Sequence, residues 1–247
     1  MGKETFVGFG NYIAVIQDPE FWFSLGRTLY FTFLLAVLGT LMGLGYALLL
    51  NEPFKGRGLL RALIIIPWAI PAVVDALLWA WIYHSQVGAL NGLLYQLGLI
   101  KDYMTFLRGG LWALTAIAVA FLWQGSSFAG LLFLAGLQAI PEDMYDAAEI
   151  DGANVLQRFI HVTLPWLRPI LTIVLVILTL YGFLLFDHIY VMTAGGPGTD
   201  TTVLSWYIFT VTFTYYRLGK GTAAAFILTG IVMILAYFYV KLIYQER

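Results

Sequence analysis

Long apolar runs separated by short polar segments dominate the pattern along the chain. Five runs lack Asp, Glu, Lys and Arg, at residues 28–51, 76–100, 109–141, 169–186 and 221–240. A helix needs about 20 mostly apolar residues to cross roughly 30 Å of hydrocarbon. The runs are continuous rather than alternating, which favours helices over the strands of a membrane barrel. The pattern predicts five spans, at roughly 25–50, 62–84, 111–138, 167–189 and 220–242.

The second predicted span differs from the others because it contains a charged residue and two prolines. It starts near Leu63 and carries Asp75, with Pro67 and Pro71 between them. Proline removes a backbone donor and clashes with the preceding turn, so a kink is expected here. An ionisable residue inside a span is costly, which makes Asp75 a candidate functional residue. The alternative is a hydrogen-bonded carboxyl that seals a contact between two helices.

Two other segments are apolar in part but do not have the pattern of a span. Residues 6–23 contain Asp18 and Pro19 and predict an amphipathic interfacial segment. Residues 201–216 contain five threonines and four tyrosines or tryptophans. That composition is typical of a membrane interface, so an interfacial or partly re-entrant helix is expected there.

Composition agrees with this pattern and excludes several classes of protein. Of the 247 residues, 61% are apolar and 11% are charged. Soluble domains have about 45–50% apolar residues and about 25% charged residues. The chain has no cysteine, which excludes disulfides and thiolate metal sites. Its three histidines are scattered without ligand spacing, and a net charge of −1 offers no basic field for nucleic acid. We therefore predict one polytopic all-α membrane domain over residues 1–247, with no metal site.

The positive charges assign the two sides of the membrane. Lys and Arg divide seven to six between the sides, so the tight loop with Lys55, Arg57 and Arg61 decides the orientation. That side is predicted to be cytoplasmic. It also carries residues 141–165, whereas residues 190–218 form an outer loop.

Residues 141–165 form the one long polar segment between spans, and five of the fourteen acids lie in residues 142–151. Pro141 followed by two acids is typical of a helix start, and Gly152 allows a sharp turn. A second short helix over 153–161 should follow, with Pro165 breaking the chain before the next span. The simplest alternative is a solvated loop. However, the segment also has an apolar face, which its own bundle or a docked partner must cover.

Several motifs together resemble a known family. Asp146-Ala147-Ala148, Asp151-Gly152-Ala153 and Leu164-Pro165 resemble the EAA loop of the membrane subunits of ABC importers, although Asp146 stands where Glu is usual and Val162 where Ile is usual. The outer loop carries Thr193-Ala194-Gly195-Gly196-Pro197, which resembles the T-x-G-G-P loop of the carbohydrate-uptake branch. Residues 6–12 resemble the stretch that precedes the second span in these permeases. Members usually have at least one further span before that stretch, so either five spans are natural here or a first span is left out.

The resemblance implies a type I ABC importer permease with about five transmembrane helices plus interfacial and coupling helices. It implies a prokaryotic cytoplasmic-membrane subunit that pairs with a second, different permease, two ATPases and an extracytoplasmic solute-binding protein. ATP and magnesium would bind the ATPases, and this chain would bind no cofactor and catalyse no reaction. The residues expected to contact the ATPase are Tyr145, Asp146, Ala147, Ala148, Glu149, Asp151, Gly152, Leu164 and Pro165.

Sugars are bound by aromatic faces together with hydrogen-bonding side chains. Polar groups in the middle of the third span must face protein or water. On these grounds the candidate substrate-path residues are Trp123, Gln124, Ser126, Asp75, Trp79, Asp187, His188 and Tyr190. Asp187 and His188 have an alternative role, which is to cap the loop shaped by Gly195, Gly196 and Pro197.

Three other functions stay open at this point. The same architecture could import a sugar phosphate, a polyamine or an amino acid, although an anionic substrate would favour more Arg or Lys along the path. An intramembrane enzyme would need a catalytic pair, and Asp75 has no obvious partner in the sequence. A secondary transporter predicts internal repeats of broken helices, which the sequence does not show.

Overall fold

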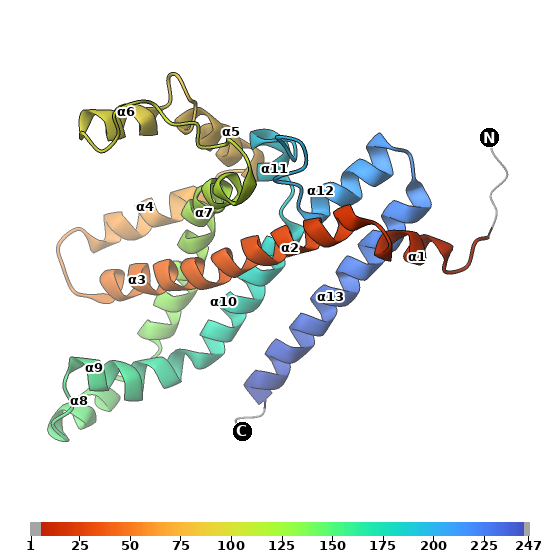
Figure 1. Cartoon of the computed structure of the whole chain (residues 1–247). Coiled ribbons are helices and arrows are strands. Elements are labelled where there is room, and N and C mark those ends of the chain that lie inside the picture. The colour runs from red at the N-terminus through yellow and green to blue at the C-terminus, as the bar shows by residue number, and fades with distance from the viewer. Residues whose placement is uncertain (1–5, 245–247) are drawn as a thin grey trace.

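The computed structural model describes residues 6–244, and helices make up its regular structure (Figure 1). Of the predicted domain, residues 1–5 and 245–247 lie outside the described residues. Within the described part, four helices are long and apolar enough to cross a membrane, and a bent pair of shorter helices makes up to five. The predicted number of about five spans therefore matches this upper value.

The first long helix begins earlier than the sequence pattern predicted. α1 (Gly10–Ile16) is short, and α2 (Pro19–Leu34) continues through a π-helical turn at Leu35–Gly39 into α3 (Thr40–Asn51). Asp18 caps α2 by accepting a hydrogen bond from the Glu20 amide at 3.0 Å, and Pro19 occupies the first turn. This N-cap and N1 proline are a strong start signal. Residues 19–23, which belong to the segment predicted as interfacial, are therefore the first turns of this long helix.

The second predicted span is a pair of helices rather than one kinked helix. α4 (Arg57–Ala69) and α5 (Ala72–Ile82) meet at an angle of 98°. Pro71 precedes α5 and restricts Ile70 to an extended conformation, which ends α4. α6 (Ala89–Gln96) follows at the end of the molecule where α5 lies (Figure 1).

α7 (Gly110–Gln138) is the central helix, and 72% of its most apolar window is buried. It approaches α3 closely because small residues face one another at the contact. A Cβ added at Gly43 would lie 2.6 Å from the Ala129 Cβ and 2.9 Å from the Gly130 amide nitrogen. Close approach through small residues is how membrane helices pack without a hydrophobic driving force.

The polar segment after α7 folds into two short helices. α8 (Glu142–Ile150) is followed by α9 (Val155–Arg158), a π-helical turn at Phe159–Thr163, and α10 (Leu164–Leu184). Residues Val155–Leu184 are thus one helical segment, and the predicted break at Pro165 was wrong. The wide π turn lies directly before Pro165, where it accommodates a residue without an amide donor.

The last part of the chain begins at the end of the molecule opposite α8 and α9, and its final helix runs back from that end (Figure 1). α11 (Asp187–Met192) leads through a loop to α12 (Leu204–Phe209), a π-helical turn at Thr210–Thr214, and α13 (Leu218–Tyr244). Residues 201–216, predicted as an interfacial segment, contain α12 and this π turn. Figure 1 shows α12 beside the first turns of α2 and α13.

Candidate functional site

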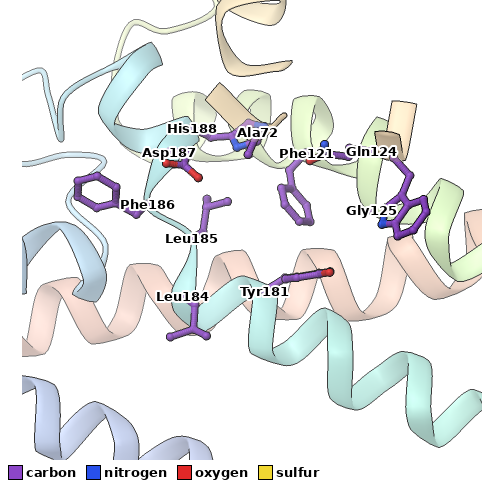
Figure 2. A pocket seen from close by; sticks show the side chains of 11 residues that line it. Ala72, Phe121, Gln124, Gly125, Tyr181, Leu184, Leu185, Phe186, Asp187 and His188 are labelled. Atoms are coloured by element: carbon purple, nitrogen blue, oxygen red, sulfur yellow. The ribbon is translucent and has the colours of Figure 1, made fainter. Parts of the chain in front are cut away.

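A cavity of about 290 Å³ lies where α7, α10, α11 and the α4–α5 break meet (Figure 2). Its lining residues are Trp68, Ala72, Phe121, Gln124, Gly125, Tyr181, Leu184, Leu185, Phe186, Asp187 and His188. Most of them are apolar or aromatic, and Gln124, Asp187 and His188 supply polar groups. This is the usual composition of a small-molecule site, because apolar walls exclude water and a few polar groups orient the ligand. We call this space the membrane cavity.

A buried pair of side chains lies beside the membrane cavity, and His188 is the member that lines it. Asp75 Oδ2 and His188 Nε2 are 2.9 Å apart, and both side chains are fully buried. The pair joins α5 to α11. Asp75 Oδ1 and His188 Nδ1 have no hydrogen-bond partner among the described side chains and backbone groups. Asp75 therefore lies behind the cavity wall and holds the imidazole that forms it.

Gln124 supports the wall as well as lining it. Its Nε2 donates a 2.6 Å hydrogen bond to the carbonyl oxygen of Ile70. Ile70 ends α4, where a helix leaves carbonyl groups without internal partners. An unpaired carbonyl in a membrane is expensive, so this bond stabilises the α4–α5 break.

The other predicted path residues do not line the membrane cavity. Ser126 is fully buried and donates its hydroxyl to the Leu122 carbonyl of its own helix. Trp79 and Trp123 pack edge to face with ring centroids 6.1 Å apart. Of the eight candidates, Gln124, Asp187 and His188 line the cavity. The sequence pattern missed Trp68, Phe121, Tyr181 and Phe186, because aromatic residues occur throughout the spans and their spacing does not distinguish a lining ring from a packed one.

Tyr190, another candidate, belongs to an aromatic group next to the outer loop. Its ring stacks on Phe186 at 5.7 Å between centroids and lies 5.7 Å from the Trp206 ring. The outer loop positions that indole. Gly195 has φ +82°, and a side chain there would collide with the Trp206 ring. The glycine is needed both for the turn and for the close approach of the indole.

Threonines hold the outer loop in shape. The Thr193 and Thr201 hydroxyl oxygens are 2.7 Å apart, and Thr201 donates to the Gly196 carbonyl at 2.8 Å. Thr202 donates to the Gly195 carbonyl at 3.2 Å, and the Gly196–Pro197 peptide bond is cis. The predicted loop residues thus form a compact turn that supports α12.

The turn between α8 and α9 is a Schellman motif. Gly152 has φ +79°, and its amide donates to the Glu149 carbonyl at 3.0 Å. The Ala153 amide donates to the Ala148 carbonyl at 2.9 Å. These two bonds satisfy the last carbonyls of α8 and require a left-handed residue at the glycine position. The motif explains why a glycine follows the two alanines at this spacing.

We call residues 142–158 the elbow, and side-chain contacts stabilise it in addition to the Schellman motif. Arg158 pairs with Glu149 at 2.8 Å, and the Tyr145 and Thr163 hydroxyl oxygens are 2.9 Å apart. Asp146, Ala147 and Asp151 are exposed, and Ala148 is half-buried. Leu164 and Pro165 lie outside the elbow, at the start of α10.

Large apolar side chains are also exposed at the elbow. Ile150 is 86% exposed, Val155 75% and Leu156 66%. The membrane cavity lies at the far end of α10, between its last turns and α11. The elbow and the membrane cavity are therefore at opposite ends of one helical segment.

Comparison with known proteins gives consistent matches. A family model described as "Binding-protein-dependent transport system inner membrane component" matches residues 35–246. The trehalose/maltose transport system permease protein MalF of Thermococcus litoralis is 42% identical over 97% of this chain and 80% of its own. The sulfoquinovosyl glycerol transport system permease protein SmoG of Agrobacterium fabrum is 40% identical over 96% of this chain and 77% of its own.

A solved structure shares the fold. A chain in the crystal structure of a bacterial ABC transporter involved in importing the acidic polysaccharide alginate superposes with a TM-score of 0.86. The two chains are 26% identical, and the match covers 97% of this chain and 84% of the other. The predicted all-α fold of a type I importer permease is confirmed.

Proposed function

The chain belongs to the family of binding-protein-dependent transport system inner membrane components, and on this premise we propose that it imports a sugar or oligosaccharide across the prokaryotic cytoplasmic membrane. It is a multi-pass permease subunit. The observation that carries the sugar assignment is the similarity, at 42% and 40% identity, to permeases named for trehalose and maltose and for sulfoquinovosyl glycerol. The solved structure of an amino acid ABC transporter is matched at 23% identity, which shows a shared fold only.

The membrane cavity is the proposed substrate contact within this chain. Aromatic rings of Phe121, Tyr181 and Phe186 offer surfaces for the C–H faces of a pyranose. Gln124 and Asp187 offer hydrogen-bonding groups for its hydroxyls. The cavity is small for an oligosaccharide, so one sugar ring at a time would occupy it.

The elbow is the proposed contact with a cytoplasmic ATPase. Apolar side chains as exposed as those of Ile150, Val155 and Leu156 at a polar end of a membrane protein indicate a protein partner. The acids Asp146 and Asp151 beside them would pair with basic groups on that partner. ATP and magnesium would bind to the ATPase subunits. Closure of two ATPases would then move the elbows of two permease subunits.

The proposed complex contains two further kinds of subunit. A second, different permease completes the path, and an extracytoplasmic binding protein delivers the solute on the side of the outer loop. The family description supports the binding protein directly.

Reconstitution tests this proposal. The chain is purified with its co-expressed partner permease, ATPases and binding protein, placed in liposomes, and assayed for uptake of labelled trehalose and maltose. ATP-dependent uptake of either sugar is expected, and liposomes without the ATPases are the control. Uptake of sugar without ATPases, or of an amino acid or polyamine instead of sugar, would contradict the proposal.

A further inference from the structure

A second cavity lies at the outer end of the molecule. It has a volume of about 560 Å³ and is enclosed by the first turn of α2, the outer loop, α12 and the start of α13. Its walls carry four threonines, the rings of Trp206, Tyr207 and Tyr215, two carboxylates and two cations. We call it the outer cavity. Its volume is within the range of small-ligand sites.

Three of the four charged side chains that line the outer cavity, Asp18, Glu20 and Lys220, are held by ion pairs. Asp18 Oδ2 accepts hydrogen bonds from Lys220 Nζ at 2.6 Å and from the Tyr207 hydroxyl at 2.8 Å. Burial acts to raise the pKa of Asp18, but hydrogen bonds from Lys220, Tyr207 and the Glu20 amide outweigh it and lower the pKa. Glu20 pairs with Arg27 at 2.7 Å. The lining charges are balanced, which favours a neutral polar ligand over an anion.

One buried hydroxyl in the wall of the outer cavity has no partner among the described residues. Thr210 Oγ1 is buried and makes no hydrogen bond within the described part of the chain. Thr212, two residues later, donates to the carbonyl four residues before it at 2.6 Å, as helix threonines commonly do. Buried polar groups normally have partners, so this wall of the cavity contains a hydroxyl whose hydrogen bonding the described part of the chain does not complete.

Aromatic rings connect the two cavities. Trp206 lines the outer cavity and Phe186 lines the membrane cavity, and their ring centroids are 5.6 Å apart. Tyr190 lies 5.7 Å from both rings, and Phe209 lies 5.0 Å from Phe186 and 5.3 Å from Trp206. These four residues form one aromatic surface between the two sites.

We propose that the outer cavity is a second carbohydrate subsite, which holds a neutral oligosaccharide before it crosses the aromatic surface to the membrane cavity. The balanced charges and hydroxyls bind the polar rim of the sugar, and the rings bind its C–H faces. Trp206 belongs to both the subsite and the aromatic surface, so it contacts the sugar on entry. This subsite rests on the proposed sugar-import function.

The absence of cysteine in this chain allows a direct test. Thr214→Cys introduces a single thiol at an exposed position of the outer cavity lining. Val87→Cys is the matched control, because Val87 is 70% exposed in the loop between α5 and α6 and lies outside both cavities. The reconstituted complex without binding protein is treated with a methanethiosulfonate reagent. Modification of this chain is followed by mass, with and without excess trehalose or maltose.

The expected result is protection of the first thiol alone. At ten times its dissociation constant, a bound sugar slows modification of the Thr214→Cys variant by about tenfold and leaves Val87→Cys unchanged. Trp206→Leu should also raise the sugar concentration for half-maximal uptake by roughly fivefold, with partial rescue in Trp206→Phe. Phe226→Leu is the control, since Phe226 is 62% exposed on α13 and lines neither cavity.

Each outcome separates the subsite from the general function. If trehalose or maltose is transported but protects neither thiol, the subsite is wrong and sugar import stands. Transport of an amino acid or polyamine instead of either sugar, with no protection by sugar, refutes the sugar assignment and the subsite with it. Protection by the sugar-free binding protein, and not by sugar, shows a protein contact and overturns the proposal.

Discussion

Replacing Gly152 with alanine isolates the contribution of backbone conformation to the elbow. Gly152 has φ +79°, and no atom lies within 4 Å of the position that a Cβ would occupy. The substitution therefore adds no clash, and its cost is that of placing an L-residue in the left-handed region. This cost is roughly 1–2 kcal/mol, which lowers the population of the elbow geometry by about 5–30-fold, because 1.4 kcal/mol is a factor of ten.

The chain contains a matched control for this substitution. Gly98 follows α6 with φ +69° and also has no atom within 4 Å of an added Cβ. Its amide donates to the Tyr95 carbonyl at 3.0 Å, and the Leu99 amide donates to the Leu94 carbonyl at 2.9 Å. Gly98→Ala therefore costs the same free energy in the same motif, but on a helix far from the elbow.

The assay is ATP hydrolysis stimulated by sugar-loaded binding protein in the reconstituted complex. Gly152→Ala should reduce the stimulation by about 5–30-fold, and Gly98→Ala should leave it within about twofold of the unaltered protein. Gly152→Asn should recover most of the loss, since asparagine tolerates the left-handed region better than alanine. Equal losses in the two alanine variants, or unchanged stimulation in Gly152→Ala, would refute the reasoning.

Three further predictions concern buried and outer polar groups. Asp75→Ala leaves His188 without its partner and should destabilise the chain in nanodiscs by about 1.5–3 kcal/mol. The double variant Asp75→Leu/His188→Leu should recover most of this stability in thermal unfolding, and no recovery would argue against an isolated pair. Gln124→Leu leaves the Ile70 carbonyl unpaired and should lower sugar uptake by roughly tenfold, and unaltered uptake kinetics would exclude this role. The lowered pKa of Asp18, set by its hydrogen bonds against the effect of burial, means that its stabilising contribution is present at neutral pH and is lost as the pH falls through that pKa. The melting temperature should then fall more steeply below about pH 5 than in Asp18→Asn, and parallel curves would contradict this.

Local signals in the sequence predicted most of the helices. Charge-free runs located the long helices, because a membrane span must be apolar over its whole length. Gly152, with two alanines before it, located the elbow, since the left-handed turn depends on residues that are close in sequence. The start of α2 was also present locally, as Asp18-Pro19-Glu20, although the segment was interpreted as interfacial.

Prolines show where local signals were insufficient. The same restriction on backbone conformation applies to Pro67, Pro71 and Pro165, but their settings differ. Pro67 lies inside α4, and Pro71 lies at the 98° bend between α4 and α5. Pro165 lies in a continuous helical segment. The outcome depends on what satisfies the nearby backbone. Gln124 on α7 caps the break, and a π turn precedes Pro165.

The sequence by itself determined the membrane class, the positions of the long helices, the elbow and the family motifs. These features depend on apolar length and on residues close in the chain. Only the tertiary structure decided that Asp75 pairs with His188, 113 positions later, and that Gln124, Asp187 and His188 share one cavity. It also placed Trp206 between two cavities. Such contacts depend on how helices cross, and apolar spans of similar composition leave that choice to packing across the whole molecule.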